Sequence, residues 1–154
     1  MMMKKEREMA FHTAYMQCAE AIADLSRCER LKVGAIIVKD GNIISMGYNG
    51  TPKGFDNCCE TEKMVENPET GKLDRVLVTK PEVLHAEANA ITKAAKSTYA
   101  TDNSTLYCTN SCCFDCAKLI VQAGVKVFCF KHAYRDLSGL ELLEKAGVEV
   151  IQLP

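Results

Sequence analysis

Two short segments hold the residues whose types and spacing could do chemistry. Residues 84–87 supply His85 and Glu87, and residues 111–116 supply Cys113 and Cys116. One imidazole and two thiolates are zinc ligands, and a zinc ion with three protein ligands keeps its fourth position for water. A carboxylate two residues beyond a ligand can take a proton from that water and pass it on. The pattern therefore predicts a catalytic metal site, with His85, Cys113 and Cys116 as ligands and Glu87 as the proton carrier.

The two cysteines open a predicted helix. Cys113 and Cys116 are three residues apart, which places both sulfurs on one side of the first turn, where free amides and the helix dipole favour thiolates. Cys112 is a rival ligand, but only Cys113 has a partner at the three-residue spacing. A closed structural site, in which Cys112 is the fourth ligand and the zinc only stabilises the fold, stays an alternative. The presence of Glu87 argues against it.

Helices and strands are expected to alternate around these segments. The predicted helices and strands are, in chain order, helix 4–26, strands 33–38 and 43–48, a helix from after Pro81 to 96–97, strand 105–109, helix 113–123, strand 125–130, helix 138–146 and strand 148–153. Between Tyr48 and Pro81 the sequence shows little periodicity except at residues 76–78. We expect one α/β domain over residues 1–154, with a largely buried five-stranded sheet and a long loop insertion at about 50–84.

Composition excludes several classes of protein. The chain has 154 residues, 19 basic and 20 acidic, with a formal net charge of -1, so no global field attracts nucleic acid or a membrane surface. No apolar run approaches the roughly 20 residues that span a bilayer. We expect a cytoplasmic protein, in the host cytoplasm if viral. Its nine cysteines are an odd number in a reducing compartment, which disfavours a disulfide framework. Cys18, Cys108 and Cys129 are predicted to be buried thiols.

His85-x-Glu87 followed by Cys113-x-x-Cys116 resembles the cytidine deaminase superfamily, although Cys112 stands where that family has proline. Segments 26–28, 32–35, 47–52 and 105–107 resemble its deoxycytidylate deaminase branch, especially the bacteriophage members. The likeness runs from about Met9 to Gln152. It implies a three-layer α/β/α fold with a mixed five-stranded sheet, a catalytic Zn²⁺, and hydrolytic deamination of dCMP to dUMP, with dCTP as another candidate substrate.

The resemblance also implies how a nucleotide is bound. Asn49 is expected to hold the sugar, although an Asn-Gly pair by itself usually caps a turn, and Ala86 is expected to contact the substrate. Tyr134 lies just beyond the predicted strand 125–130, where α/β sheets commonly present residues to a ligand, so it either stacks on the substrate or packs against a neighbouring subunit. The implied regulation is activation by dCTP and inhibition by dTTP with Mg²⁺, in a homo-oligomer that is commonly a hexamer. The residues expected to bind the effectors are Gly47, Tyr48, Gly50 and Lys53. Four cations are candidates for the phosphate or else solvated surface charges, namely Lys53, Lys96, Lys131 and Arg135.

Cys28, Cys58 and Cys59 form a second cluster. They either hold an additional structural zinc, as in some phage deoxycytidylate deaminases, or are free reduced thiols. No histidine occurs in the loop insertion at about 50–84, so Glu60, Glu62 or Glu82 would have to complete the ligand set.

Two other functions compete with the nucleotide deaminase. A deaminase of RNA or single-stranded DNA uses the same zinc chemistry, but such enzymes usually display a basic stripe with aromatic platforms. This chain is near neutral, has no Trp and carries five Tyr and five Phe. A non-catalytic zinc module that binds a partner or nucleotide is the other alternative.

Overall fold

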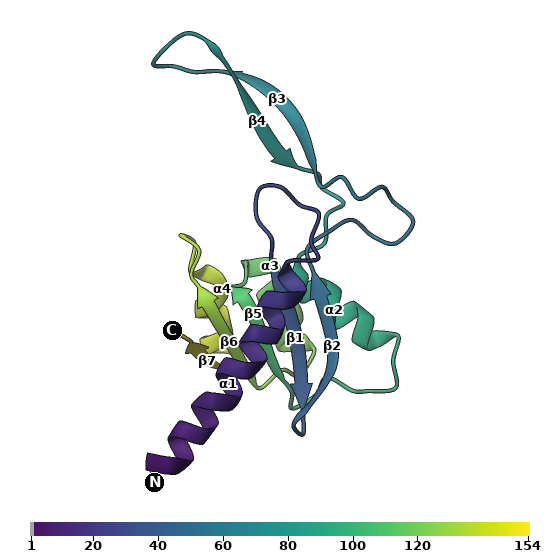
Figure 1. Ribbon diagram of the computed structural model, residues 1–154, viewed down its shortest axis with the longest axis vertical. Coiled ribbons are helices and arrows are strands. Elements are labelled where there is room, and N and C mark those ends of the chain that lie inside the picture. The colour runs from purple at the N-terminus through teal and green to yellow at the C-terminus, as the bar shows by residue number, and fades with distance from the viewer. Residues whose placement is uncertain (1) are drawn as a thin grey trace.

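A five-stranded mixed sheet organises the protein, whose computed structural model describes residues 2–154 (Figure 1). The elements in chain order are α1 (Met2–Ala23), β1 (Gly34–Lys39), β2 (Asn42–Tyr48), β3 (Glu60–Glu66), β4 (Leu73–Thr79), α2 (Ala86–Ala95), β5 (Thr105–Asn110), α3 (Phe114–Gln122), β6 (Val127–His132), α4 (Ser138–Lys145) and β7 (Glu149–Gln152). The strand order is β2-β1-β5-β6-β7. β1 is antiparallel to β2 and β5, whereas β5, β6 and β7 are parallel.

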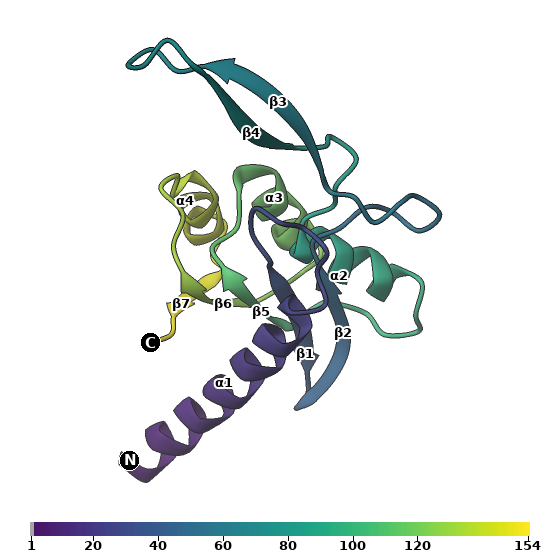
Figure 2. The ribbon, with the colours of Figure 1, turned by 45° about the horizontal axis from the view of Figure 1, so that its top comes forward.

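Helices cover both faces of the sheet (Figure 2). On one face, Ile37 and Phe128 pack in a core with residues of α2, α3 and α4. On the other, Ile36 and Cys129 pack with Met16 of α1. Successive strand residues thus point to opposite layers, as the period of two requires. The predicted three-layer α/β/α fold is confirmed.

Only the second half of α1 packs on the sheet. Its N-terminal half extends past the sheet (Figure 1), leaving Met9 43% and Phe11 50% exposed. Cys18 is also exposed, so its predicted burial is wrong, while Cys108 and Cys129 are buried as predicted. None of the described helices combines the length and apolar character needed to cross a membrane.

The insertion predicted as a loop contains a β-hairpin instead. β3 and β4 pair antiparallel from Glu60↔Thr79 at the base to Glu66↔Leu73 at the tip, and the ribbon stands away from the sheet (Figures 1 and 2). Most of its residues are exposed. An exposed ribbon has no buried face to impose an apolar alternation, which is why its sequence did not predict two strands.

Candidate active site

The starts of two helices meet at one end of the sheet. His85 is the N-cap of α2, and Cys113 is the N-cap of α3, directly after β5. The Cys116 amide donates a hydrogen bond to the Cys113 sulfur at 3.4 Å, which satisfies one of the free amides of the first turn. Gly50 and Leu84 exchange two backbone hydrogen bonds and hold the chain just before His85. The motif residues therefore occupy the helix starts that their sequence predicted.

The three predicted zinc ligands come together. His85 Nδ1 lies 3.4 Å from Cys113 Sγ and 3.5 Å from Cys116 Sγ, and the three ligand atoms lie within 4.8 Å of one another. Tetrahedral zinc, with Zn–S of about 2.3 Å and Zn–N of about 2.0 Å, requires N···S separations of about 3.5 Å. The residues fit Zn²⁺. Within residues 2–154, no other group of His, Cys, Asp or Glu has such an arrangement.

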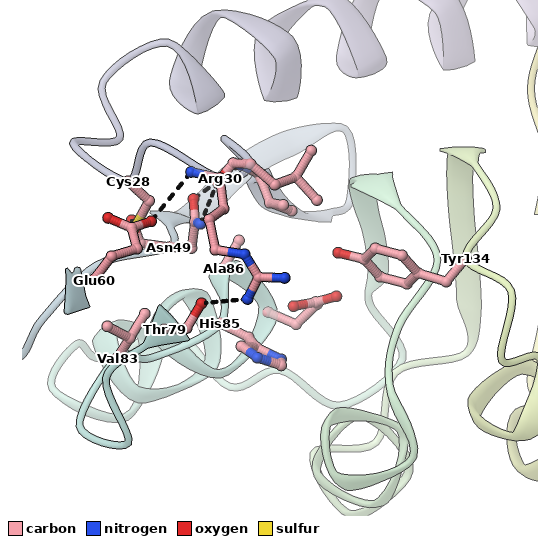
Figure 3. A pocket seen from close by; sticks show the side chains of 12 residues that line it. Cys28, Arg30, Asn49, Glu60, Thr79, Val83, His85, Ala86 and Tyr134 are labelled. Carbon is pink, nitrogen blue, oxygen red and sulfur yellow. Dashed lines mark hydrogen bonds between the residues drawn. The ribbon is translucent and has the colours of Figure 1, made fainter. Parts of the chain in front are cut away.

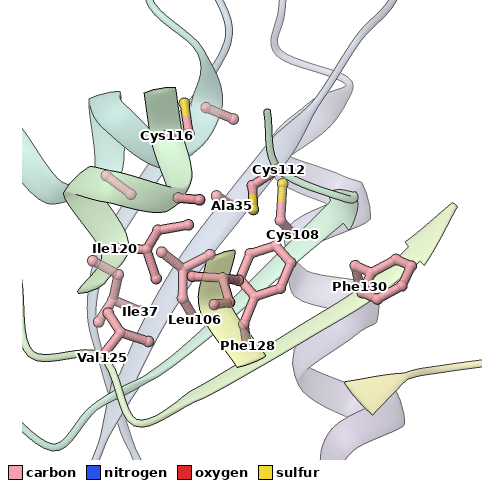
Figure 4. Packing of buried hydrophobic residues seen from close by; sticks show 14 of the residues in the cluster. Ala35, Ile37, Leu106, Cys108, Cys112, Cys116, Ile120, Val125, Phe128 and Phe130 are labelled. Atoms are coloured by element: carbon pink, nitrogen blue, oxygen red, sulfur yellow. The ribbon is translucent and has the colours of Figure 1, made fainter. Parts of the chain in front are cut away.

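Cys112 is not part of this group. Its side chain is fully buried and lies beside Cys108 in the core, whereas the Cys116 sulfur lies apart from them (Figure 4), 3.5 Å from His85 Nδ1. Burial raises the pKa of Cys112 to about 12, so the thiol keeps its proton. The described residues thus supply three ligands and not the four of a closed structural site.

The ligand thiols differ in acidity. Hydrogen bonds from the Cys116 and His85 side chains lower the pKa of Cys113 to about 4. The hydrogen bond with Cys113, together with burial, raises the pKa of Cys116. The hydrogen bond with Cys113 also raises the pKa of His85. Without a metal, hydrogen bonds from Cys116 and His85 thus stabilise the Cys113 thiolate. A bound divalent cation would replace the protons of these hydrogen bonds.

Glu87 lies beside the ligands in the first turn of α2. It is 3% exposed, and its Oε1 accepts a hydrogen bond of 3.4 Å from the Cys108 thiol. Burial raises the pKa of Glu87, against the opposing effect of its backbone hydrogen bond. A buried carboxyl with a raised pKa can hold a proton as well as release it, which suits a group that must act as both base and acid.

Two residues that the sequence analysis missed support the cysteine turn. A Cβ atom on Gly139 of α4 would lie 2.3 Å from the Cys112 carbonyl oxygen, so only glycine allows this approach. A glycine inside a helical pattern was the available signal. The buried Ser111 hydroxyl accepts a hydrogen bond of 2.8 Å from the Tyr134 amide and fixes the chain after β6. Tyr134 is thereby held over the site.

A cavity of about 350 Å³ adjoins the ligands (Figure 3), and Glu87 and His85 are among the residues that line it. Ala86, Asn49 and Tyr134, the predicted substrate-binding residues, all line it. The Asn49 side chain accepts from the Val33 amide at 2.8 Å and donates to the Leu31 carbonyl at 2.7 Å. Burial raises the pKa of Tyr134, so its hydroxyl stays protonated.

The cation in this cavity is one that sequence reasoning overlooked. Arg30 and His85 both line the cavity, and Figure 3 shows the Arg30 guanidinium hydrogen-bonded to Thr79. It is the only Lys or Arg among the described lining residues. None of the four cations predicted for the phosphate lines this cavity, and one of them, Lys131, forms an ion pair with Glu20 of α1. Arg30 lies in the irregular loop between α1 and β1 and belongs to no local motif, so no pattern distinguished it from a surface charge.

The predicted effector segment packs on α2. A Cβ atom on Gly47 would lie 2.5 Å from the Ala90 amide nitrogen. The Tyr48 carbonyl accepts a hydrogen bond of 2.9 Å from the Asn89 side chain. Lys53 is exposed. These contacts give Gly47 and Tyr48 a packing role, and effector binding by the segment stays a prediction.

The second cysteine cluster forms a covalent link. Cys28 and Cys59 are joined by a disulfide, while Cys58 is exposed and its thiol donates to the Glu60 carbonyl at 3.3 Å. The expectation of no disulfide is therefore wrong for this pair. Because the disulfide uses two of the three sulfurs, the predicted second zinc site is not formed in this structure.

The fold and the site together define a class. A layered α/β/α domain with a His-Cys-Cys zinc site and a buried glutamate beside it is a zinc-dependent deaminase. Residues 9–132 match the family described as the cytidine and deoxycytidylate deaminase zinc-binding region. The chain belongs to this family.

Similar proteins agree with that assignment. The chain is 34% identical to the deoxycytidylate deaminase of Enterobacteria phage T4, over 90% of this chain and 88% of that protein. It is 35% identical to the deoxycytidylate deaminase of Mus musculus, over 94% and 80% of the two chains. Among solved structures it resembles the dCMP deaminase of cyanophage S-TIM5 in complex with dCMP and dUMP, with 47% identity, a TM-score of 0.79, and coverage of 92% and 95%.

Proposed function

We propose that this protein catalyses the hydrolytic deamination of dCMP to dUMP with release of ammonia. The observation that carries the proposal is the buried Glu87 beside a three-ligand zinc site, at the floor of a cavity that also contains Arg30. The names of the relatives described above support deoxycytidylate as the substrate.

Glu87 carries the protons of the reaction. When bound, Zn²⁺ would supply a water whose proton is lost near neutral pH. Glu87 accepts that proton and delivers one to the ring nitrogen N3, which makes C4 electrophilic. Water thus adds across the N3=C4 bond, with the hydroxyl on C4 and the proton on N3. Glu87 then takes the proton of the C4 hydroxyl and passes it to the amine, so that the bond from C4 to the amine breaks, the C4 carbonyl forms and ammonia leaves.

The cavity walls orient the nucleotide. Ala86 presents only a methyl group beside Glu87, which leaves room for a flat ring. The Asn49 amide uses one N–H and one oxygen lone pair on the chain, so a second N–H and lone pair remain for a sugar hydroxyl. The Tyr134 ring faces the cavity from the opposite side (Figure 3), where it can contact the base or the sugar.

Arg30 is the proposed phosphate ligand. A guanidinium offers five N–H donors in a planar fork, and the Arg30 Nη1 uses one on the Thr79 hydroxyl at 3.2 Å. The remaining donors are available to a 5′-phosphate, which arginine binds with charge-assisted hydrogen bonds. This assignment replaces the four cations that the sequence analysis offered.

Regulation and assembly are the finer part of the proposal. As the resemblance implies, we propose activation by dCTP, inhibition by dTTP with Mg²⁺, and a homo-oligomer, with a hexamer favoured. The exposed apolar side chains of the projecting hairpin, including Met64 and Leu73, support an assembly that covers them. Light scattering would measure the oligomer, and a hyperbolic substrate curve unchanged by either triphosphate would refute the regulation.

One assay tests the proposed function. Ammonia release should be measured from cytidine, deoxycytidine, dCMP and dCTP, each with and without dCTP or dTTP as effector. The expected result is turnover that depends on zinc and is fastest with dCMP. Faster turnover of dCTP would change the substrate assignment, and absence of turnover on every compound would favour the non-catalytic zinc module.

A further inference from the structure

The loop that carries Arg30 has no regular structure of its own. It links α1 to β1, and neither helix nor strand hydrogen bonds constrain its backbone. An arginine on such a loop loses side-chain entropy when it is confined to one geometry. Arg30 therefore needs contacts from elsewhere in the chain to hold its guanidinium in the cavity.

A buried carboxylate supplies the first contact. Glu60, the first residue of β3, is only 9% exposed, and its Oε1 accepts hydrogen bonds from the amides of Glu29 at 3.0 Å and Arg30 at 3.2 Å. None of the ion pairs formed within residues 2–154 involves Glu60. The carboxylate thus binds the backbone of Arg30 and leaves the guanidinium charge free (Figure 3).

The residue opposite Glu60 supplies the second contact. Thr79, the last residue of β4, pairs with Glu60 across the base of the hairpin, and its hydroxyl accepts the hydrogen bond from Arg30 Nη1. One cross-strand pair therefore holds both the backbone and the side chain of Arg30. The Cys28–Cys59 disulfide ties the same loop to the residue before Glu60.

We propose that Glu60, acting with Thr79, is a positioning residue that sets the place of Arg30 and thereby the preference for a 5′-monophosphate over a nucleoside. This inference rests on the proposed deaminase function and on Arg30 as its phosphate ligand. The base of the hairpin then contributes to substrate specificity, although among the described residues no hydrogen bond joins Glu60 or Thr79 to the metal ligands or Glu87. Loss of Glu60 should weaken phosphate recognition and leave the chemical step intact.

Kinetics of two substrates test the proposal. kcat and KM would be measured for dCMP and for deoxycytidine, which lacks the phosphate, in the zinc-loaded wild type and in Glu60→Ala, Glu60→Gln and Arg30→Ala. For Glu60→Ala we expect kcat/KM on dCMP to fall roughly 10-fold or more through KM, in line with charge-assisted hydrogen bonds. Deoxycytidine turnover should not change. Glu60→Gln, which keeps a neutral acceptor, should restore part of the loss.

Glu62→Gln is the matched control. Glu62 lies two residues along β3, but its side chain is 58% exposed and pairs with Arg75. It should behave as the wild type with both substrates. Thr79→Val gives a second test that leaves the buried carboxylate in place, and it should also raise KM for dCMP alone. Its control, Thr61→Val, changes an exposed threonine of the same hairpin.

The outcomes separate the inference from the function on which it rests. If the wild type turns over neither substrate, the proposed function and this inference both fail. If the wild type prefers dCMP but the Glu60 and Thr79 variants keep that preference, only the positioning role is overturned. An equal loss on both substrates, or an equal effect of Glu62→Gln, would show a general structural role and overturn it as well.

Discussion

The two sides of the cavity are built differently. The metal side consists of helix starts, with His85 and Cys113 as N-caps of helices that rest on the sheet core. The nucleotide side consists of the Arg30 loop and the base of an exposed hairpin, joined by a few polar contacts and one disulfide. The metal ligands thus gain their geometry from regular structure, whereas Arg30 gains its position from specific long-range contacts. Changes on the two sides should therefore have different consequences.

The largest effect is expected at Glu87 on the metal side. Glu87→Gln keeps the size of the side chain but cannot carry a proton, so activity should fall by about 10³-fold or more. Zinc content should stay at the wild-type level, because Glu87 is not among the three ligands. Steady-state assays with metal analysis would measure both. Undiminished turnover would refute the role of Glu87 as the proton carrier.

Substitutions of Cys116 and Cys112 distinguish a catalytic site with three protein ligands from a structural site with four. Cys116→Ser should lower zinc content well below that of the wild type, because the hydroxyl is a poor replacement for a thiolate ligand. Cys112→Ala changes a buried thiol outside the ligand group and should keep zinc and activity. Metal analysis after dialysis provides the comparison. Zinc loss in Cys112→Ala would identify Cys112 as a fourth ligand and contradict the catalytic site.

Removal of the Cys28–Cys59 disulfide tests how much this link stabilises the nucleotide side. The disulfide links residues 31 positions apart, so chain entropy predicts a loss of roughly 3–4 kcal/mol in the free energy of unfolding for Cys59→Ser. Denaturant unfolding without reductant would measure it, and added reductant should abolish the difference from the wild type. Cys58→Ser is the control, since Cys58 is unpaired and exposed. Equal stability of Cys59→Ser and the wild type would show that the link does not stabilise the loop.

The smallest effect is expected where α4 supports the metal side. Gly139→Ala forces a methyl group against the carbonyls of Cys112 and Cys113. The overpacking should cost about 1–3 kcal/mol in the free energy of unfolding and weaken zinc retention. Glu141→Ala, at an exposed position of the same helix, should change neither. Thermal unfolding and zinc titration would detect the difference. Equal behaviour of the two variants would mean that the backbone adjusts without moving the ligands.

The sequence alone determined the layered fold and the metal side. Apolar periodicity identified the helices, because each packs one face on the core, and short apolar runs identified the strands of the main sheet, whose central members are buried on both faces. Cys113 and Cys116 were predictable as a pair because their geometry is local: a spacing of three residues in a first helical turn fixes where the side chains point. Their meeting with His85, which is 28 and 31 positions away, was predicted from the combination of the two motifs.

Only the tertiary structure decided the nucleotide side. Arg30, Glu60 and Thr79 meet through hydrogen bonds between residues 30 to 49 positions apart, and no periodic pattern encodes such contacts. The hairpin that brings them together is exposed, so burial imposed no alternation on its sequence. The Cys28–Cys59 pairing was equally hidden, because cysteine spacing does not reveal which sulfurs meet in space. Short motifs are enough to predict residues that act within one helical turn, whereas the position of a loop depends on contacts across the whole folded chain.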